Sequence, residues 1–175
     1  MTVSGGADAL DAGNSADLRE SKSREEIMLA RNAMTLSPAI ATPETSIPAV
    51  AALMRDWDTG IIPIVDGRES MELVGEITDR DITTKCIAEN HMATCDAAMH
   101  MSHERLVTVL PETPLDGCVS LMKESQVRRL PVVEPDGRLV GMLSLADVVR
   151  RLQHTDPHRV VELIGEISQP VAIHA

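Results

Sequence analysis

The feature that most constrains the fold of this chain is an internal repeat. Three segments of the first half return in the second half in the same order. The pairs are Pro43-Glu44-Thr45 with Pro111-Glu112-Thr113, Ile62-Pro63-Ile64-Val65 with Leu130-Pro131-Val132-Val133, and Leu73-Val74-Gly75 with Leu139-Val140-Gly141. Because a repeated sequence specifies one supersecondary unit built twice, the chain is predicted to contain two similar units.

Apolar residues in each copy first follow a helical spacing. Residues 47–54 and 115–122 carry apolar side chains at positions i, i+3, i+4 and i+7, which predicts an amphipathic helix in each copy. Thr45 and Thr113 stand just before these segments. Threonine is a favoured N-cap residue, so we expect these two side chains to cap the helices.

The spacing then becomes that of extended chain. Short runs rich in Ile, Val and Leu lie on either side of an Asp-Gly pair in each copy, which predicts a β-hairpin. The expected strands span residues 61–65, 72–77, 130–133 and 138–143. A shorter strand is expected before each first helix, near 39–41 and 107–109, and a second helix after each hairpin, at 80–88 and 145–152.

These elements together predict an α/β (α+β) fold of two β-α-β-β-α repeats with flanking helices. We expect a disordered tail over 1–24, a first repeat with a leading helix over 25–90, a linker over 91–98, a second repeat over 99–153, and a C-terminal helix and tail over 154–175. The tail is polar and rich in small residues, a composition that cannot bury a core. The leading helix is placed at 25–34 and the C-terminal helix at 157–167.

Composition excludes several functions. A formal net charge of −11 repels nucleic-acid phosphates. Trp57 is the only aromatic residue, so serial base stacking is excluded and a bound base is expected to lie between aliphatic and methionine side chains. No apolar run reaches the length needed to cross a bilayer. We therefore expect no membrane partner. Three cysteines without a C-x-x-C pair indicate a reduced, cytoplasmic protein.

Each hairpin ends in the same motif, a hydroxyl residue followed three positions later by an aspartate. Thr78 and Asp81 form it in the first copy, Ser144 and Asp147 in the second. One interpretation is a capping box at the start of the following helix. The other adds a ligand: the helix N-terminus binds a phosphate, and the carboxylate accepts hydrogen bonds from ribose hydroxyls. The two interpretations are compatible.

The paired motif, in register with the two proline-containing strands, resembles the CBS domain (the cystathionine β-synthase regulatory domain). The resemblance covers residues 33–152 and has the tandem arrangement called a Bateman module, here standing alone. It implies two small sheets related by a pseudo-twofold axis, with helices outside and two clefts between the copies. Members of the family bind adenosine-containing ligands such as AMP, ADP, ATP, S-adenosylmethionine or NAD-type molecules in these clefts.

The resemblance also implies residue roles. Asp81 and Asp147 would hold ribose hydroxyls, and Thr78 and Ser144 would meet phosphate. The residues implied around the adenine are Ile40, Ile62, Pro63, Val107, Leu130 and Pro131, and the cations implied near the phosphates are Arg80, Arg128 and Arg129. Gly60 and Ile61 occupy the positions of Arg128 and Arg129 in the first copy, so we expect two unequal sites.

Other chemistry is weakly indicated. His91, Cys95, His100 and His103 are potential metal ligands around the linker, but their spacing matches no zinc motif, so we expect solvated histidines and no metal. No nucleophile stands beside a base, so we expect no catalytic residues and no enzyme.

The preferred hypothesis is a regulatory sensor that needs no cofactor and binds an adenine nucleotide as its regulatory ligand. It would be a homodimer that relays a conformational change to an unknown effector protein. The alternative is a structural dimerisation or scaffold module whose clefts are vestigial.

Overall fold

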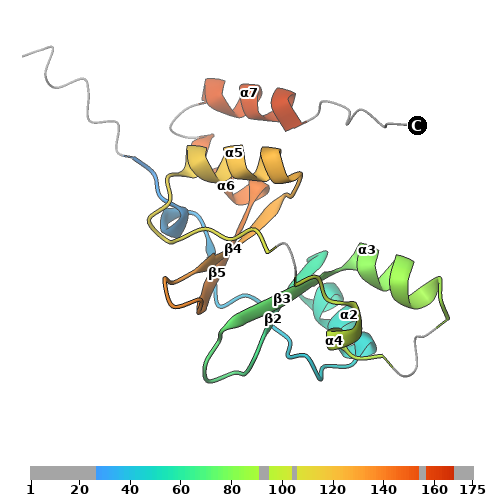
Figure 1. The fold of residues 1–175 in the computed structure, drawn as a ribbon. Helices are drawn as coiled ribbons and strands as arrows, with labels where there is room; N and C mark the ends of the chain where they lie inside the picture. Colours follow the sequence, from blue (N-terminus) through green and yellow to red (C-terminus); the bar gives the residue numbers. More distant parts are fainter. Residues whose placement is uncertain (1–26, 91–94, 104–105, 154–156, 168–175) are drawn as a thin grey trace, which may run out of the picture.

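The computed structural model describes residues 27–90, 95–103, 106–153 and 157–167 (Figure 1). The tail expected over 1–24 lies outside these residues. Two antiparallel hairpins form the centre of the molecule. Strand β2 (Ile61–Val65) pairs with β3 (Leu73–Thr78), and β4 (Arg129–Val133) pairs with β5 (Leu139–Ser144). Both hairpins predicted from the Asp-Gly turns are therefore confirmed.

Helices flank each hairpin in the same chain order. Helix α2 (Ile47–Asp56) precedes the first hairpin, and α3 (Asp79–Asp81) follows it and continues as the π-helix η2 (Ile82–Ile87). Helix α5 (Leu115–Ser125) precedes the second hairpin, α6 (Leu145–Leu152) follows it, and α7 (Pro157–Ile167) comes last. The short start strands are single parallel bridges, Ala41 to Ile64 and Val109 to Val132. The α+β fold of two β-α-β-β-α repeats is confirmed.

Each copy has its own core. In the first copy Val50, Ile62 and Ile77 are fully buried between the hairpin and its helices, and in the second copy Leu130 and Leu143 hold equivalent places. A smaller cluster around Val65, Val133 and Leu139 joins the two hairpins. There the Leu73 N–H donates to the Gly137 carbonyl over 3.1 Å, and the Leu139 N–H donates to the Met71 carbonyl over 2.8 Å.

The segment that leads into each copy packs on the other copy. Strand β1 (Thr35–Leu36) pairs with β5 of the second copy, and Ala30 donates its N–H to the Thr113 carbonyl over 2.8 Å. Reciprocally, Ser102 pairs with Glu76 of the first copy, and Ala97 in α4 (Ala97–His100) donates to the Thr45 carbonyl over 2.8 Å. The two copies are thus interlocked.

The structure contradicts two predictions about the start of each copy. The described part of the leading segment forms only the 3₁₀ turn η1 (Ala30–Asn32), because its N–H groups bond to carbonyls of the second copy instead of continuing a helix. Thr45 and Thr113 do not cap α2 and α5, whose N-cap residues are Ser46 and Pro114. Their hydroxyls accept hydrogen bonds from the N–H groups of Thr42 and Leu110, which closes the preceding turn.

The expectation of solvated histidines around the linker is also wrong for His100. Cys95 and His100 are buried, with 4% and 7% of their surface exposed, because α4 docks onto the first core. His103 is exposed, as expected, and His91 lies outside the described residues. Within the described parts of the chain, no helix is both long and apolar enough to cross a bilayer.

The crossing segments approach the hairpins closely at one glycine in each copy. A Cβ on Gly141 would lie 2.7 Å from Met34 Sδ and 3.0 Å from the Thr35 carbonyl oxygen, and Gly75 has the same relation to Met101 and Ser102. Backbone atoms cannot move aside as a flexible side chain can. The close approach therefore explains why both copies carry glycine three residues before the hydroxyl residue of the motif.

We predict that Gly141→Ala lowers the free energy of unfolding by about 1–3 kcal/mol, the usual range for overpacking. Chemical denaturation followed by circular dichroism measures this change. Gly165→Ala is the matched control, because nothing lies within 4 Å of the added methyl and alanine favours the helix. Equal effects of the two substitutions would contradict the packing argument.

Candidate functional site

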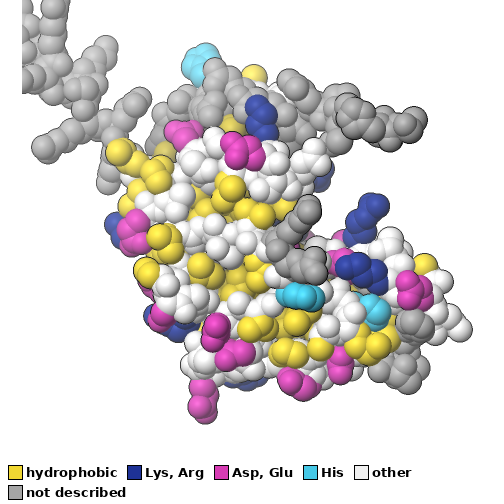
Figure 2. Space-filling model, viewed as in Figure 1, with side chains coloured by type: hydrophobic (Ala, Val, Ile, Leu, Met, Phe, Trp, Pro, Cys, Tyr) yellow, Lys and Arg dark blue, Asp and Glu magenta, His cyan; other side chains and the backbone are white. Residues whose placement is uncertain are grey.

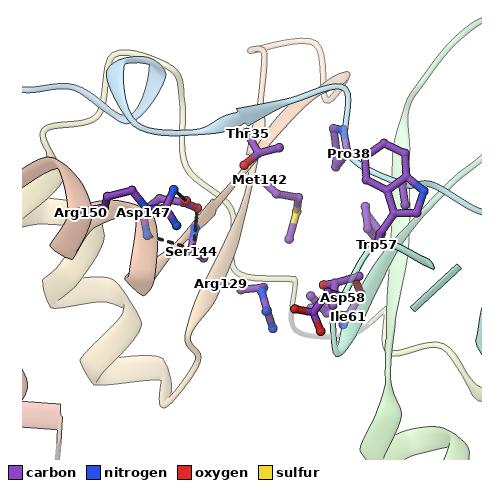
Figure 3. A pocket seen from close by; sticks show the side chains of 13 residues that line it. Thr35, Pro38, Trp57, Asp58, Ile61, Arg129, Met142, Ser144, Asp147 and Arg150 are labelled. Carbon is purple, nitrogen blue, oxygen red and sulfur yellow. Dashed lines mark hydrogen bonds and ion pairs between the residues drawn. The ribbon is translucent and has the colours of Figure 1, made fainter. Parts of the chain in front are cut away.

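A cleft of about 320 Å³ lies between the two copies (Figure 3). Its wall from the second copy consists of Arg129, Met142, Ser144, Asp147 and Arg150, and its wall from the first consists of Pro38, Ala39, Trp57, Asp58, Thr59, Ile61 and Pro63, with Thr35 of β1 at its edge. The shared motif of the second copy therefore faces residues of the first. A molecule bound here would contact both copies.

Ser144 and Asp147 form a complete capping box at the start of α6. Asp147 Oδ2 accepts hydrogen bonds from the Ser144 N–H, over 3.0 Å, and from its hydroxyl, and the Asp147 N–H donates to Ser144 Oγ over 3.1 Å. Arg150 Nη1 donates to the other oxygen, Oδ1, over 3.1 Å. The capping interpretation is confirmed, and it uses only one carboxylate oxygen.

Thr78 and Asp81 repeat this geometry in the first copy. Asp81 Oδ2 accepts from the Thr78 N–H over 2.9 Å and from its hydroxyl, and Lys85 Nζ lies 2.8 Å from Oδ1. Burial acts to raise the pKa of Asp81, but hydrogen bonds from Lys85 and Thr78 outweigh it and hold the pKa below its ordinary value. Asp81 is therefore held as a carboxylate.

A carboxylate distinguishes the first copy from the second beside this motif. Glu76 pairs with Pro63 in the β2–β3 ladder, as Met142 pairs with Pro131 in the β4–β5 ladder. Glu76 thus holds the position at which Met142 lines the cleft. Burial raises the pKa of Glu76 above its ordinary value, and the nearby charge of Asp81 adds to this effect. The surroundings of the first motif are more acidic than those of the second.

The structure brings together four of the residues expected at a ligand site: Pro63, Arg129, Ser144 and Asp147 all line the cleft. Thr78, Asp81 and Arg80 lie at the first copy's own helix start and do not line it, and Arg128 is exposed beside it. Ile40 packs on the cluster that joins the hairpins, Val107 packs on the second core, and Pro131 is fully buried.

Ile62 and Leu130 do not present their side chains to the cleft. Both are completely buried in the cores of their copies. Successive residues of a strand point to opposite faces, so Ile61 and Pro63 face the cleft while Ile62 between them faces the core. The expectation that these two side chains contact an adenine is inconsistent with their place in the fold.

Two residues that sequence reasoning missed also line the cleft. Trp57 follows the last residue of α2, with 55% of its surface exposed, and its indole lies beside Pro38 (Figure 3). An aromatic face is therefore present in the cleft, in addition to the aliphatic and methionine side chains that we expected around a base. Arg150 lies three residues after Asp147, and this helical spacing was the signal that could have found it. No local pattern marks Trp57, because the opposite wall belongs to the other copy.

The sequence model of the CBS domain matches residues 29–87 and 98–154. The chain belongs to the CBS domain family, with two domains in tandem. It is 29% identical over 144 residues to hypoxic response protein 1 of Mycobacterium tuberculosis, which covers 82% of this chain and 96% of that protein. A crystal structure of hypoxic response protein I with two coordinated zinc ions superposes with a TM-score of 0.63 at 32% identity, covering 71% and 99% of the two chains.

Two other solved CBS pairs carry adenosine-containing ligands. The CBS domain pair of protein MJ0100, in complex with 5′-methylthioadenosine and S-adenosyl-L-methionine, has a TM-score of 0.65 at 25% identity and covers 74% of this chain and 99% of that one. CBSX2 in complex with AMP has a TM-score of 0.61 at 26% identity and covers 72% and 96%.

An enzyme is also among the relatives. Inosine-5′-monophosphate dehydrogenase of Staphylococcus haemolyticus is 30% identical over 149 residues, which is 85% of this chain but 29% of the enzyme. The chain therefore spans less than a third of that relative's length. The CBS domains of this chain, residues 29–87 and 98–154, account for most of the length that it shares with the enzyme.

The raised pKa of Glu76 predicts a pH-dependent effect of Glu76→Gln. An acid whose pKa is raised by folding destabilises the fold as pH rises through that pKa, because its ionised form is disfavoured in the native state. Glu76→Gln should therefore raise the melting temperature at pH 8, and the gain should shrink as pH falls toward 4.5, the ordinary pKa of the residue. Thermal unfolding over this pH range, with exposed Glu72→Gln as control, measures it. A gain that is independent of pH would contradict the assignment.

Proposed function

We propose that this chain is a cytoplasmic regulatory module that binds an adenosine-containing nucleotide in the cleft between its two CBS domains. The observation that carries this proposal is that one cleft combines a helix N-terminus, the carboxylates of Asp58 and Asp147, two arginines and the single aromatic side chain, drawn from both copies. The solved complexes of MJ0100 and CBSX2 support the proposal, because S-adenosylmethionine, methylthioadenosine and AMP share an adenosine.

In this proposal Asp147 binds the sugar, and Arg129 and Arg150 bind the phosphate. Asp147 Oδ2 is held by the capping box, whereas Oδ1 accepts a hydrogen bond from Arg150, whose side chain is 69% exposed. An exposed arginine has the freedom to turn toward a phosphate, which leaves Oδ1 to accept hydrogen bonds from ribose hydroxyls. Arg129, half-buried on the same wall of the cleft, adds a second positive charge.

We assign the base to the end of the cleft that lies away from Asp147 and Arg150. Trp57 and Pro38 provide an aromatic face and an apolar edge there, and Met142 provides a polarisable side chain. Stacking on an aromatic face suits any purine and selects no particular phosphate chain. Trp57 belongs to the first copy and Asp147 to the second, so a bound nucleotide would favour one relative packing of the copies. An effector protein would respond to that packing.

We predict that AMP, ADP or ATP raises the melting temperature, and that Trp57→Leu and Arg129→Gln each weaken nucleotide binding by roughly tenfold or more, the range for a lost stacking or charged contact. Asp147→Ala should weaken binding by roughly ten- to a hundredfold. Isothermal titration calorimetry measures these affinities. Arg128→Gln is the matched control, because this neighbouring arginine is exposed and does not line the cleft.

Folding stability must be measured on the same variants. Asp147→Ala also breaks the capping box, which is worth about 1 kcal/mol, whereas Trp57→Leu and Arg129→Gln leave it intact. If the cleft is vestigial and the module purely structural, none of AMP, ADP, ATP, S-adenosylmethionine and NAD will change the melting temperature. Unchanged affinity in all three variants would exclude the described cleft as the binding site.

We further propose that the chain forms a homodimer. Hydrophobic side chains reach the surface on the face shown in Figure 2. Those most exposed among the described residues include Ile27, Leu36, Met99 and Val161, each with more than 60% of its surface exposed. Light scattering should therefore give twice the chain mass of 18.9 kDa. A mass of one chain across a wide range of concentrations would contradict it.

A further inference from the structure

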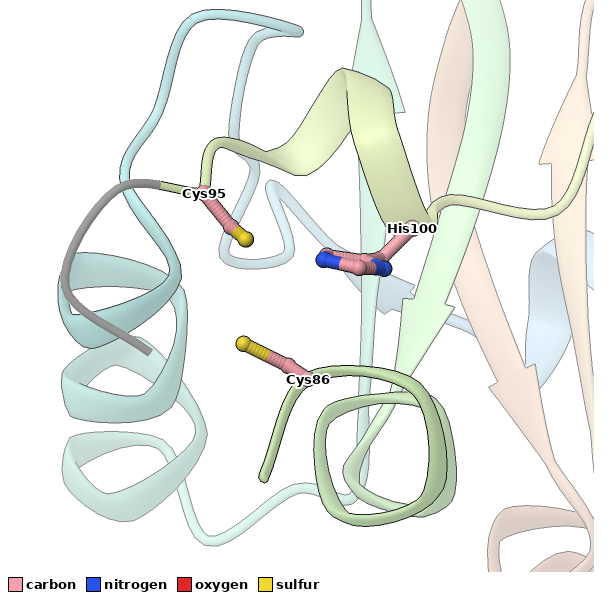
Figure 4. Close-up of side chains that lie close together, drawn as sticks. All are labelled: Cys86, Cys95 and His100. Atoms are coloured by element: carbon pink, nitrogen blue, oxygen red, sulfur yellow. The ribbon is translucent and has the colours of Figure 1, made fainter. Parts of the chain in front are cut away.

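Three side chains with metal-binding chemistry meet in the first copy, apart from the residues that line the nucleotide cleft. Cys86, Cys95 and His100 each offer one ligand atom, and these atoms all lie within 4.8 Å of one another (Figure 4). Cys86 comes from η2, Cys95 precedes α4, and His100 ends α4. Their exposed fractions are 0%, 4% and 7%, and no disulfide involves either cysteine.

The buried histidine has an unused ligand atom. Within the described part of the chain, His100 Nε2 is shielded from solvent and has no hydrogen-bond partner. A buried polar atom left in this state destabilises a protein, because it has lost its hydrogen bonds to water and gained none in return. Figure 4 shows the imidazole ring directed toward the space between the two thiols. A cation in that space would satisfy the nitrogen.

The second copy shows that the fold does not require these residue types. Matched hydrogen bonds align the two leading segments: the Ile47 N–H donates to the Cys95 carbonyl as the Leu115 N–H donates to the Met28 carbonyl. In this register, the counterparts of Cys86, Cys95 and His100 are Leu152, Met28 and Ala33. These three counterparts are apolar and pack on the second core. Ordinary hydrophobic packing therefore suffices at this place, and the first copy carries two thiols and an imidazole instead.

The helix that carries Cys86 differs in the same way. Residues Ile82–Ile87 form a π-helix, whereas α6 of the second copy is a regular α-helix through Leu152. Short π-helical segments are rare and occur frequently at functional sites. The irregular backbone and the three ligand side chains are thus found together in one copy and are absent together from the described residues of the other.

We propose that Cys86, Cys95 and His100 bind a Zn²⁺ ion. Thiolate sulfur and imidazole nitrogen are the usual zinc ligands, at about 2.3 Å and 2.0–2.1 Å from the metal. Two sulfurs of a tetrahedral site then lie about 3.8 Å apart, so the ligand atoms need to close by no more than about 1 Å. Binding forms two Zn–S bonds and one Zn–N bond and releases the two thiol protons to solvent, with no change of oxidation state. Water would complete the tetrahedron.

The position of the site gives the ion a structural role. Cys95 and His100 flank the segment that interlocks with the first copy, whereas Cys86 belongs to the second helix of that copy. A shared metal ion would tie this segment to the body of the first copy. None of the three residues lines the nucleotide cleft, so zinc binding and nucleotide binding can be tested separately.

The test uses the full chain, stripped of metal with a chelator under anaerobic, reducing conditions and then titrated with Zn²⁺ against a chromophoric chelator. The expected result is one tightly bound zinc per chain and a higher melting temperature. Replacement by Co²⁺ should produce the sulfur-to-metal charge-transfer absorption of thiolate ligands. His100→Ala and Cys95→Ser should each weaken zinc binding at least tenfold.

Two further variants control for folding. The triple variant Cys86→Leu, Cys95→Met, His100→Ala copies the second domain, so it should keep the circular dichroism spectrum while losing zinc. Cys118→Ala removes a buried thiol of the second copy and should keep zinc binding. The proposal is overturned if the reduced parent chain binds zinc no more tightly than His100→Ala, if Cys118→Ala weakens binding as much as Cys95→Ser, or if the Co²⁺ form lacks thiolate absorption.

Discussion

The structure depends above all on the reciprocal exchange of leading segments between the two CBS domains. Backbone hydrogen bonds from Ala30 to Thr113 and from Ala97 to Thr45 hold the two exchanges in the same geometry. Each exchange passes over a glycine, Gly141 or Gly75, where a side chain would collide with the crossing backbone. The segment that leads into each copy supplies buried residues to the core of the other copy, so neither core is complete without the other copy. The cleft between the copies is a consequence of this arrangement.

The two copies have the same fold but differ in the charges around their capping boxes. Both contain the same capping box. In both, a cation pairs with Oδ1 of the aspartate: Lys85 in the first copy and Arg150 in the second. Around this common centre, Met142 has Glu76 as its counterpart. A neutral thioether tolerates an approaching phosphate, whereas a carboxylate repels it. This difference favours an anionic ligand at the second motif and agrees with the expectation of unequal sites.

The two copies also differ where the leading segment packs against the helix that follows the hairpin. In the second copy, Leu152 and its neighbours complete an apolar core, and α7 adds Leu163 to it. In the first copy, the equivalent place contains two thiols and an imidazole. Duplication allows this specialisation, because the common fold is maintained by the hairpins and by the exchanged backbone. Local side chains are then free to acquire different chemistry in each copy.

The sequence by itself determined the repeat, the two hairpins, the helices around them and the capping boxes, because each of these depends on residues close together in the chain. The periodicity of residues 47–54 and the Asp-Gly turns act through local geometry. Only the tertiary structure decided which side chains meet. Trp57 and Asp147 line one cleft, and Cys86 and His100 share one cluster, because different elements of the chain pack together. The leading helix failed as a prediction for the same reason: hydrogen bonds to the other copy replaced those within the helix.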